Sequence, residues 1–274
     1  MYLLRGQPVV YYGDEQGLAG AGGDQDARQD LFASRTAQYN DEDVVVGSKG
    51  SRDRYDTCSP LYRAIGQVAA LRKAHPALAD GAQVHRYASP SAGVFAVSRI
   101  DREGKVEYIV AANNATTART VGIATFGDRA AFEPLLGSST TLSTDAEGHT
   151  EITVPPLSVA VWKATRPIDP RRAAPPASFT SPRPGEVVRD RAEIAVSVPE
   201  SVFAEVTFAF RRAGTRSWTT LGTDDNAPYR VFHDVRAIEN GTLLEYRAVL
   251  RDSSGNVSAT STYGVVGQPQ TARR

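Results

Sequence analysis

The sequence lacks several features that mark particular classes of protein. It has one cysteine, Cys58, which excludes an intramolecular disulfide and a cysteine-based zinc site. No apolar stretch approaches the roughly 18 residues that a membrane span needs, so we expect no membrane partner. Lysine plus arginine and aspartate plus glutamate both number 31, so no basic field attracts nucleic acid. Residues 1–5 lack the basic region and apolar core of a signal peptide, which predicts a cytoplasmic protein if the chain is expressed as written.

Common catalytic and metal-binding patterns are also missing. No Gly-x-Ser-x-Gly elbow is present, so no serine–histidine–aspartate arrangement is indicated. Asp24, Asp26 and Asp30 are spaced like a calcium loop, but Arg28 occupies the third ligand position and no glycine follows. We therefore expect no metal site and no cofactor. The histidines lie far apart and show no metal-ligand spacing: His75, His85, His149 and His233.

The first segment, residues 1–80, predicts a strand, a long loop and a helix. Residues 9–12 form a continuous β-prone run between Pro8 and Gly13, typical of a strand buried on both faces. Residues 16–56 are rich in glycine, aspartate and arginine and show little periodicity, so we expect a loop. Strand, loop and helix make one βα unit, and one unit cannot close a barrel.

The helix of this segment is expected to begin after residue 59. Ser59 can cap it, Pro60 suits the first helical position, and the dipeptide His75-Pro76 ends it. Its apolar residues recur at spacings of three and four, which indicates one buried face: Leu61, Ile65, Val68 and Leu71.

The rest of the chain is expected to form two all-β domains. Residues 81–166 and 178–266 contain short alternating strands separated by turn signals, which indicates antiparallel sandwiches. Residues 167–177 have the proline-rich composition of a stiff linker. Residues 267–274 are expected to be a disordered tail. The predicted strands are 84–87, 94–100, 106–112, 120–123, 151–154 and 159–163 in the first sandwich, and 194–198, 206–210 and 244–250 in the second.

Three landmarks resemble the α-amylase family of glycoside hydrolases (family 13). Residues 6–15 read Gly-x-Pro-x-x-Tyr-Tyr-Gly-x-Glu and resemble the segment covering the eighth barrel strand. Residues 61–78 resemble the last barrel helix, and residues 154–161 resemble the end of the sandwich that follows the barrel. The resemblance covers residues 1–166, and residues 178–266 resemble bacterial immunoglobulin-like or fibronectin-like modules. The expected fold is mostly β: a partial (β/α)8-barrel remnant followed by two antiparallel β-sandwich domains.

The resemblance implies retaining hydrolysis of α-linked glucans such as starch or maltodextrin. That reaction needs two carboxyl groups about 5 to 5.5 Å apart. In the family these groups lie on strands upstream of the opening motif, so no catalytic residue is assigned and the chain is expected to be inactive alone. The resemblance further implies an extracellular parent enzyme, calcium as a possible ligand of the complete enzyme, an α-glucan or maltooligosaccharide partner and a monomer.

Two groups of residues are candidates for a role near the sugar cleft. Tyr12, Asp14 and Glu15 are expected to support the barrel rim. If the strand extends that far, these adjacent residues point to opposite faces, so the two carboxylates cannot flank one bond, and one of them is expected to orient the loop backbone at the barrel rim. Asp26 and Arg28 resemble an Asp-x-Arg element on the acceptor side of the cleft. Arg28 either contacts sugar hydroxyls in a complete enzyme or forms an ion pair that orders the loop.

The tryptophans bear on a competing function, a non-catalytic carbohydrate-binding or spacer protein of two sandwiches. Trp162 is expected in a core. Trp218 is expected on a strand of the second sandwich, where core packing is favoured over stacking on a sugar.

Overall fold

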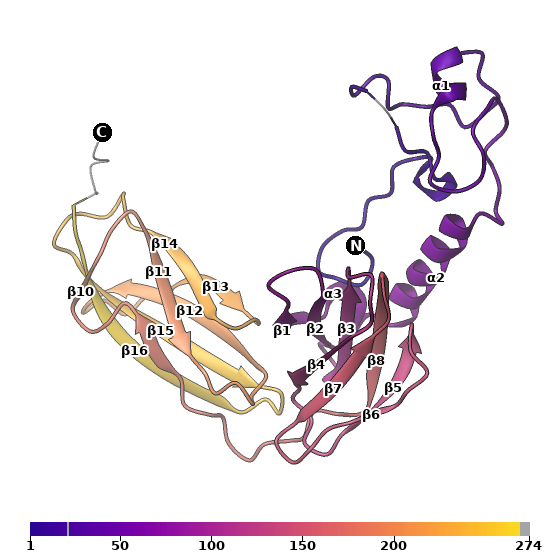
Figure 1. Ribbon diagram of the computed structural model, residues 1–274. Coiled ribbons are helices and arrows are strands. Elements are labelled where there is room, and N and C mark those ends of the chain that lie inside the picture. The colour runs from indigo at the N-terminus through magenta and orange to yellow at the C-terminus, as the bar shows by residue number, and fades with distance from the viewer. Residues whose placement is uncertain (21, 269–274) are drawn as a thin grey trace. The chain divides into compact units, whose positions relative to one another are not determined.

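The computed structural model describes residues 1–20 and 22–268. It divides into two compact units, an N-terminal unit (Met1–Asp80) and a C-terminal unit (Gly81–Arg274) (Figure 1). The expected mostly-β fold class is confirmed, since the C-terminal unit consists of sheets whose strand pairs are antiparallel except for the parallel pair β10–β16. The tail prediction concerns residues 267–274, of which 269–274 lie outside the described residues. None of the described helices is long and apolar enough to cross a membrane.

The N-terminal unit is built from short helices and loops. Among residues 1–20 and 22–80 no strand forms, and an isolated bridge pairs Leu18 with Val44. The strand expected at residues 9–12 is therefore wrong for this chain. A parallel strand needs neighbours on both sides, and this unit supplies none. Its helices are η1 (Asp14–Gln16), α1 (Ala37–Asp41), α2 (Pro60–Ala74) and α3 (Ala77–Asp80).

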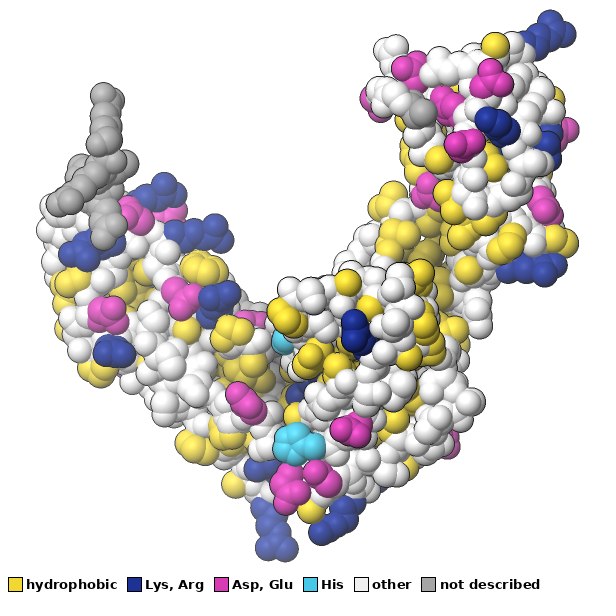
Figure 2. Space-filling view, in the orientation of Figure 1, with side chains coloured by type: hydrophobic (Ala, Val, Ile, Leu, Met, Phe, Trp, Pro, Cys, Tyr) yellow, Lys and Arg dark blue, Asp and Glu magenta, His cyan; other side chains and the backbone are white. Residues whose placement is uncertain are grey.

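Helix α2 confirms the predicted boundaries but not the predicted cap. Pro60 occupies the first turn, and His75 is the residue after the last turn. The Ser59 side chain makes no cap hydrogen bond, so that expectation is wrong. No residue of α2, all of which is described, is buried, and Figure 2 shows hydrophobic side chains gathered over this helix. The apolar residues predicted to face a core are all half-buried: Leu61, Ile65, Val68 and Leu71.

The first sandwich contains all six strands expected between residues 81 and 166. A six-stranded sheet has the order β1-β2-β3-β8-β5-β6 and faces a two-stranded sheet, β4-β7 (Figure 1). Trp162 is 1% exposed in the core between them, as predicted. The strands are β1 (Ala82–Ala88), β2 (Val94–Ile100), β3 (Val106–Asn113), β4 (Arg119–Ala124), β5 (Ala131–Leu136), β6 (Leu142–Ser143), β7 (His149–Val154) and β8 (Ser158–Pro167).

The connection between the sandwiches is irregular and hydrogen-bonded along its length. Residues 168–177 belong to no helix or strand. The backbone N–H of Arg171 donates to Ser254 Oγ at 2.7 Å, and Asn256 Nδ2 donates to the Arg171 carbonyl at 2.8 Å. Ser258 Oγ donates to the Pro175 carbonyl at 2.8 Å. These contacts fasten the connection to the second sandwich.

The second sandwich also contains its three expected strands. A five-stranded sheet has the order β10-β16-β15-β12-β13, and a three-stranded sheet has the order β14-β11-β9. The core between them includes Phe208, Tyr246 and Leu250, each fully buried. The strands are β9 (Ser178–Ser181), β10 (Glu186–Val188), β11 (Arg191–Ser197), β12 (Ala204–Arg212), β13 (Thr219–Asp224), β14 (Tyr229–Asp234), β15 (Leu243–Asp252) and β16 (Val257–Val266).

Candidate functional site

The opening motif is held in place by one arginine of helix α2. The Arg72 guanidinium lies against the segment at residues 2–6 and against the end of α3. Because several backbone carbonyl oxygens accept hydrogen bonds from this one guanidinium, Arg72 holds the start of the motif in place although no sheet forms around it. The sequence marked residues 71–78 as a family landmark but assigned Arg72 no role. It donates to the carbonyls of Tyr2 (2.6 Å), Leu4 (3.2 Å), Gly6 (2.9 Å), Leu78 (2.7 Å) and Ala79 (3.2 Å).

Two further clamps join the end of the motif to the start of α2. Gln16 Nε2 donates to the Asp56 carbonyl at 3.2 Å, and the Asp56 N–H donates to Gln16 Oε1 at 3.1 Å. Ser59 Oγ donates to the Glu15 carbonyl at 2.8 Å instead of capping the helix. The residues before α2 therefore hold the turn that contains Asp14 and Glu15.

The predicted rim residues form a tight turn. Asp14 Oδ2 accepts the Tyr11 N–H at 3.2 Å, and Glu15 Oε2 accepts the Gly13 N–H at 3.0 Å. Both carboxylates thus bind loop backbone, the arrangement expected of a supporting role. Gly13 has a φ of 93°, which only glycine adopts readily. Tyr12 is 44% exposed, with its ring centroid 4.6 Å from that of Tyr11.

The Asp26 and Arg28 side chains are exposed and do not pair with each other. Arg28 Nη2 instead contacts Asp24 Oδ2 at 2.6 Å. This ion pair lies within one loop, and the Arg28 side chain is 56% exposed. Among residues 1–20 and 22–268, no group of three or more histidine, cysteine, aspartate or glutamate side chains is placed to hold a metal ion.

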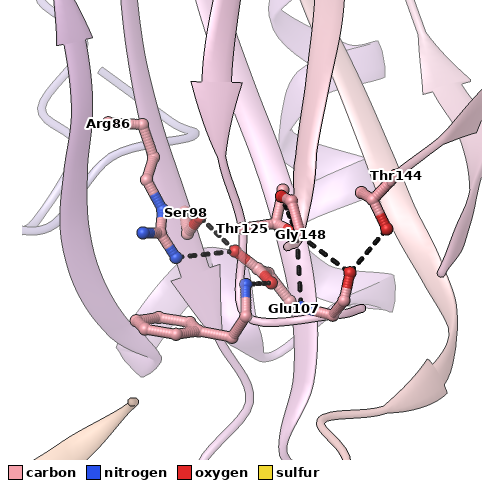
Figure 3. A network of polar contacts seen from close by, with 8 residues as sticks. Arg86, Ser98, Glu107, Thr125, Thr144 and Gly148 are labelled. Atoms are coloured by element: carbon pink, nitrogen blue, oxygen red, sulfur yellow. Dashed lines mark hydrogen bonds and ion pairs between the residues drawn. The ribbon is translucent and has the colours of Figure 1, made fainter. Parts of the chain in front are cut away.

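A buried polar network lies in the first sandwich (Figure 3). Arg86 on β1 contacts Glu107 on β3 at 3.0 Å, and these side chains are 6% and 1% exposed. Ser98 Oγ accepts Arg86 Nε at 2.7 Å and donates to Glu107 Oε1. The Phe126 N–H donates to Glu107 Oε2 at 2.8 Å. The carboxylate is therefore satisfied on both oxygens, as a buried charge requires. No sequence pattern indicates this pair, because its two residues lie on strands with no distinctive motif.

The same network reaches the second sandwich. The Arg86 guanidinium lies 4.1 Å from the Phe126 ring centroid, and Phe126 meets Phe203 edge-on with centroids 5.7 Å apart. Nearby, Arg102 Nη2 contacts Asp225 Oδ2 at 3.2 Å. Aromatic packing and an ion pair therefore join the two sandwiches within the C-terminal unit.

Trp218 does not pack in a core, so that expectation is wrong. It is half-buried immediately before β13. The guanidinium carbons of Arg211 and Arg247 lie 4.5 Å and 5.8 Å from its ring. Cation–π contacts of this kind hold the indole on the outside of the sheet, and they compete with a stacked sugar.

Comparison with known proteins finds relatives that share parts of this chain. No protein-family model matches it. An α-amylase from Streptomyces lividans is 44% identical over 94% of the chain, which spans 28% of that enzyme. A cyclomaltodextrin glucanotransferase from Bacillus sp. (strain 1011) is 29% identical over 59% of the chain, which spans 20% of it. A solved Anoxybacillus α-amylase matches 57% of the chain at 18% identity, with a TM-score of 0.42 and 28% of that structure covered. The chain therefore spans less than a third of each relative.

Proposed function

We propose that this chain forms the C-terminal part of an enzyme of the α-amylase family that hydrolyses α-linked glucans such as starch. The observation that carries the proposal is 44% identity to an α-amylase over 94% of the chain. The three family landmarks of the sequence lie within that range. The catalytic carboxylates of a retaining mechanism are supplied by an upstream barrel, and this chain supplies the rim, the last helix and the sandwiches.

The geometry of the N-terminal unit supports this role. The apolar face of α2 is half-buried, as expected of a helix that completes its packing against a barrel. Arg72 donates to the Gly6 carbonyl at the start of the opening motif, and Ser59 donates to the Glu15 carbonyl at its end. In the complete enzyme this motif becomes a strand once its parallel neighbours are present.

An activity assay tests the proposal. The 274-residue chain, purified alone, is expected to release no reducing sugar from soluble starch. A longer chain that includes the upstream barrel sequence is expected to hydrolyse starch, with retention at the anomeric carbon. Robust hydrolysis by the 274-residue chain would overturn the assignment of the catalytic carboxylates to the upstream barrel.

We further propose that Arg28 contacts sugar in the complete enzyme, with Asp26 beside it. Its ion pair with Asp24 offers a matched control. If Arg28 binds substrate, Arg28→Ala raises KM for maltooligosaccharides while Asp24→Ala leaves KM unchanged. If the pair only orders the loop, the two variants have equal effects.

The parent enzyme is proposed to be extracellular and monomeric, with α-glucan as its partner. Secretion of the longer chain into the medium and a monomer mass in light scattering test these two statements. A competing function, a stand-alone carbohydrate-binding or spacer protein, is favoured only if no longer reading frame encodes the barrel.

A further inference from the structure

Two adjoining hollows lie on the surface of the C-terminal unit. One of about 850 Å³ opens between the two sandwiches, and one of about 440 Å³ lies beside β4 and β7. Arg86, Ala124 and His149 line both, so together they form one continuous depression, here called the inter-sandwich groove. Each hollow falls in the range of roughly 300–1,000 Å³ that small-ligand sites occupy.

A buried guanidinium with a spare donor lines this groove. Arg86 Nε and Nη2 are used by Ser98 and Glu107, and among the described residues Nη1 has no partner. Figure 3 shows this nitrogen pointing away from Glu107. The ion pair and the stack on Phe126 fix the guanidinium in one orientation, so its spare N–H groups are preorganised for a ligand acceptor.

Tyr229 adds an aromatic ring to the same wall, and its hydroxyl is hydrogen-bonded to the Ala204 backbone. It is 4% exposed and lines the hollow between the sandwiches together with Phe126. Burial raises the pKa of the Tyr229 phenol to about 12, so it stays protonated and neutral in the physiological range. Apolar ring surface with a few fixed polar groups is the usual composition of a small-ligand site.

The charges of the groove favour a neutral polyol over an ion. Carboxylates line its surface: Asp145, Glu147, Glu151 and Glu200. The Arg86 charge is matched by Glu107, so an anion would meet excess negative charge. A cation would be repelled by the positively charged Arg86 guanidinium. A sugar hydroxyl both donates and accepts, so it can satisfy carboxylate and guanidinium alike.

We propose that the inter-sandwich groove binds a short stretch of α-glucan chain, with Arg86 and His149 donating to its hydroxyls. This proposal rests on the proposed function, since it takes the same polymer as ligand. It places a second sugar contact on both sandwiches, outside the catalytic barrel.

Isothermal titration of the full 274-residue chain with maltoheptaose tests the proposal. The chain is expected to bind, and Ser201→Trp, which fills the hollow between the sandwiches, is expected to weaken binding by about tenfold or more. His149→Ala is expected to weaken it by about three- to tenfold, the loss of one hydrogen bond. Thr116→Trp is the matched control, because Thr116 is exposed and does not line the groove. Circular dichroism confirms that each variant folds.

Absence of heat with maltoheptaose, or equal binding by Ser201→Trp and Thr116→Trp, overturns the proposal. Binding of tetralysine in place of maltoheptaose would mean that the groove takes a cationic peptide, which also overturns it. The longer, active chain separates this failure from failure of the proposed function. Starch hydrolysis without maltoheptaose binding in the groove removes only the groove assignment, whereas absence of hydrolysis removes the proposed function itself.

Discussion

Helix α2 and strand β2 both carry several apolar side chains, but these side chains differ sharply in burial. Val94, Ala96, Val97 and Ile100 of β2 are at most 1% exposed, whereas the apolar positions of α2 are all half-buried. The C-terminal unit thus contains the partners of its own strands, while the N-terminal unit leaves its helix face partly open. An apolar pattern predicts which face of an element is buried, but not whether the covering surface belongs to the same chain.

The largest loss of stability is expected from breaking the buried ion pair of the C-terminal unit. Glu107→Ala leaves the Arg86 charge buried and unpaired, which costs about 3–5 kcal/mol of unfolding free energy. Denaturant unfolding followed by circular dichroism measures it. The double variant Arg86→Met with Glu107→Leu is expected to recover most of this loss. A loss below about 1 kcal/mol in Glu107→Ala would contradict the buried pair.

A matched pair of truncations tests the comparison directly. Ile152 is fully buried in the first sandwich, so Ile152→Ala is expected to cost about 2–5 kcal/mol. Ile65→Ala on α2 is expected to cost less than about 1 kcal/mol in this chain. In a longer chain that includes the barrel, the cost of Ile65→Ala should rise toward that of Ile152→Ala. Equal costs in the 274-residue chain would show that α2 is already fully packed.

Removing Arg72 is expected to loosen the N-terminal unit and leave the sandwiches unchanged. Arg72→Met releases the carbonyls that hold residues 2–6. Losing a charged hydrogen-bond donor costs about 1.5–3 kcal/mol, which corresponds to at least about tenfold faster proteolysis in this region. Lys73→Met on the same helix is the control. Unchanged cleavage would mean that Arg72 does not hold the motif.

The smallest effect is a pH dependence of the second sandwich. Burial lowers the pKa of His233, whose Nδ1 lies 3.0 Å from Tyr246 Oη. The unfolded chain therefore takes up the proton at higher pH than the folded chain. Stability is full above about pH 6.5 and falls as the pH drops below that value. His233→Gln should remove this part of the slope in urea unfolding at pH 5 to 8. Parallel slopes would assign the dependence to other groups.

The sequence was most informative where local pattern and tertiary structure agree. All strands predicted from alternation formed, since their inward positions are apolar. Strand β16 was missed because its inward positions include Ser258, Thr260 and Thr262, so its hydropathy does not alternate. Strand β5 was missed because Pro134 interrupts it, and a proline argues against a strand.

The errors in the candidate site have tertiary causes. Ser59 is a good cap by type, but its side chain is oriented toward the Glu15 carbonyl, to which it donates, and it accepts no N–H from the helix. Trp218 is apolar enough for a core, but two arginines on neighbouring strands hold it outside. The Arg86–Glu107 pair joins residues that are 21 positions apart in the sequence. The hydrogen bonds of Arg72 reach carbonyls up to 70 positions away. No spacing rule detects such contacts, because they depend on strand order and loop closure.

The Arg86–Glu107 pair also constrains how this sequence can change over evolution. A single substitution at either position leaves the other charge buried and unpaired. A sequence in which only one of the two residues has been replaced is therefore unstable and rare. We expect descendants of this chain to keep both residues or to replace both together, and rarely to carry one alone. Because Arg86 also lines the inter-sandwich groove, retention of the pair would preserve the ligand contact even without direct selection on binding.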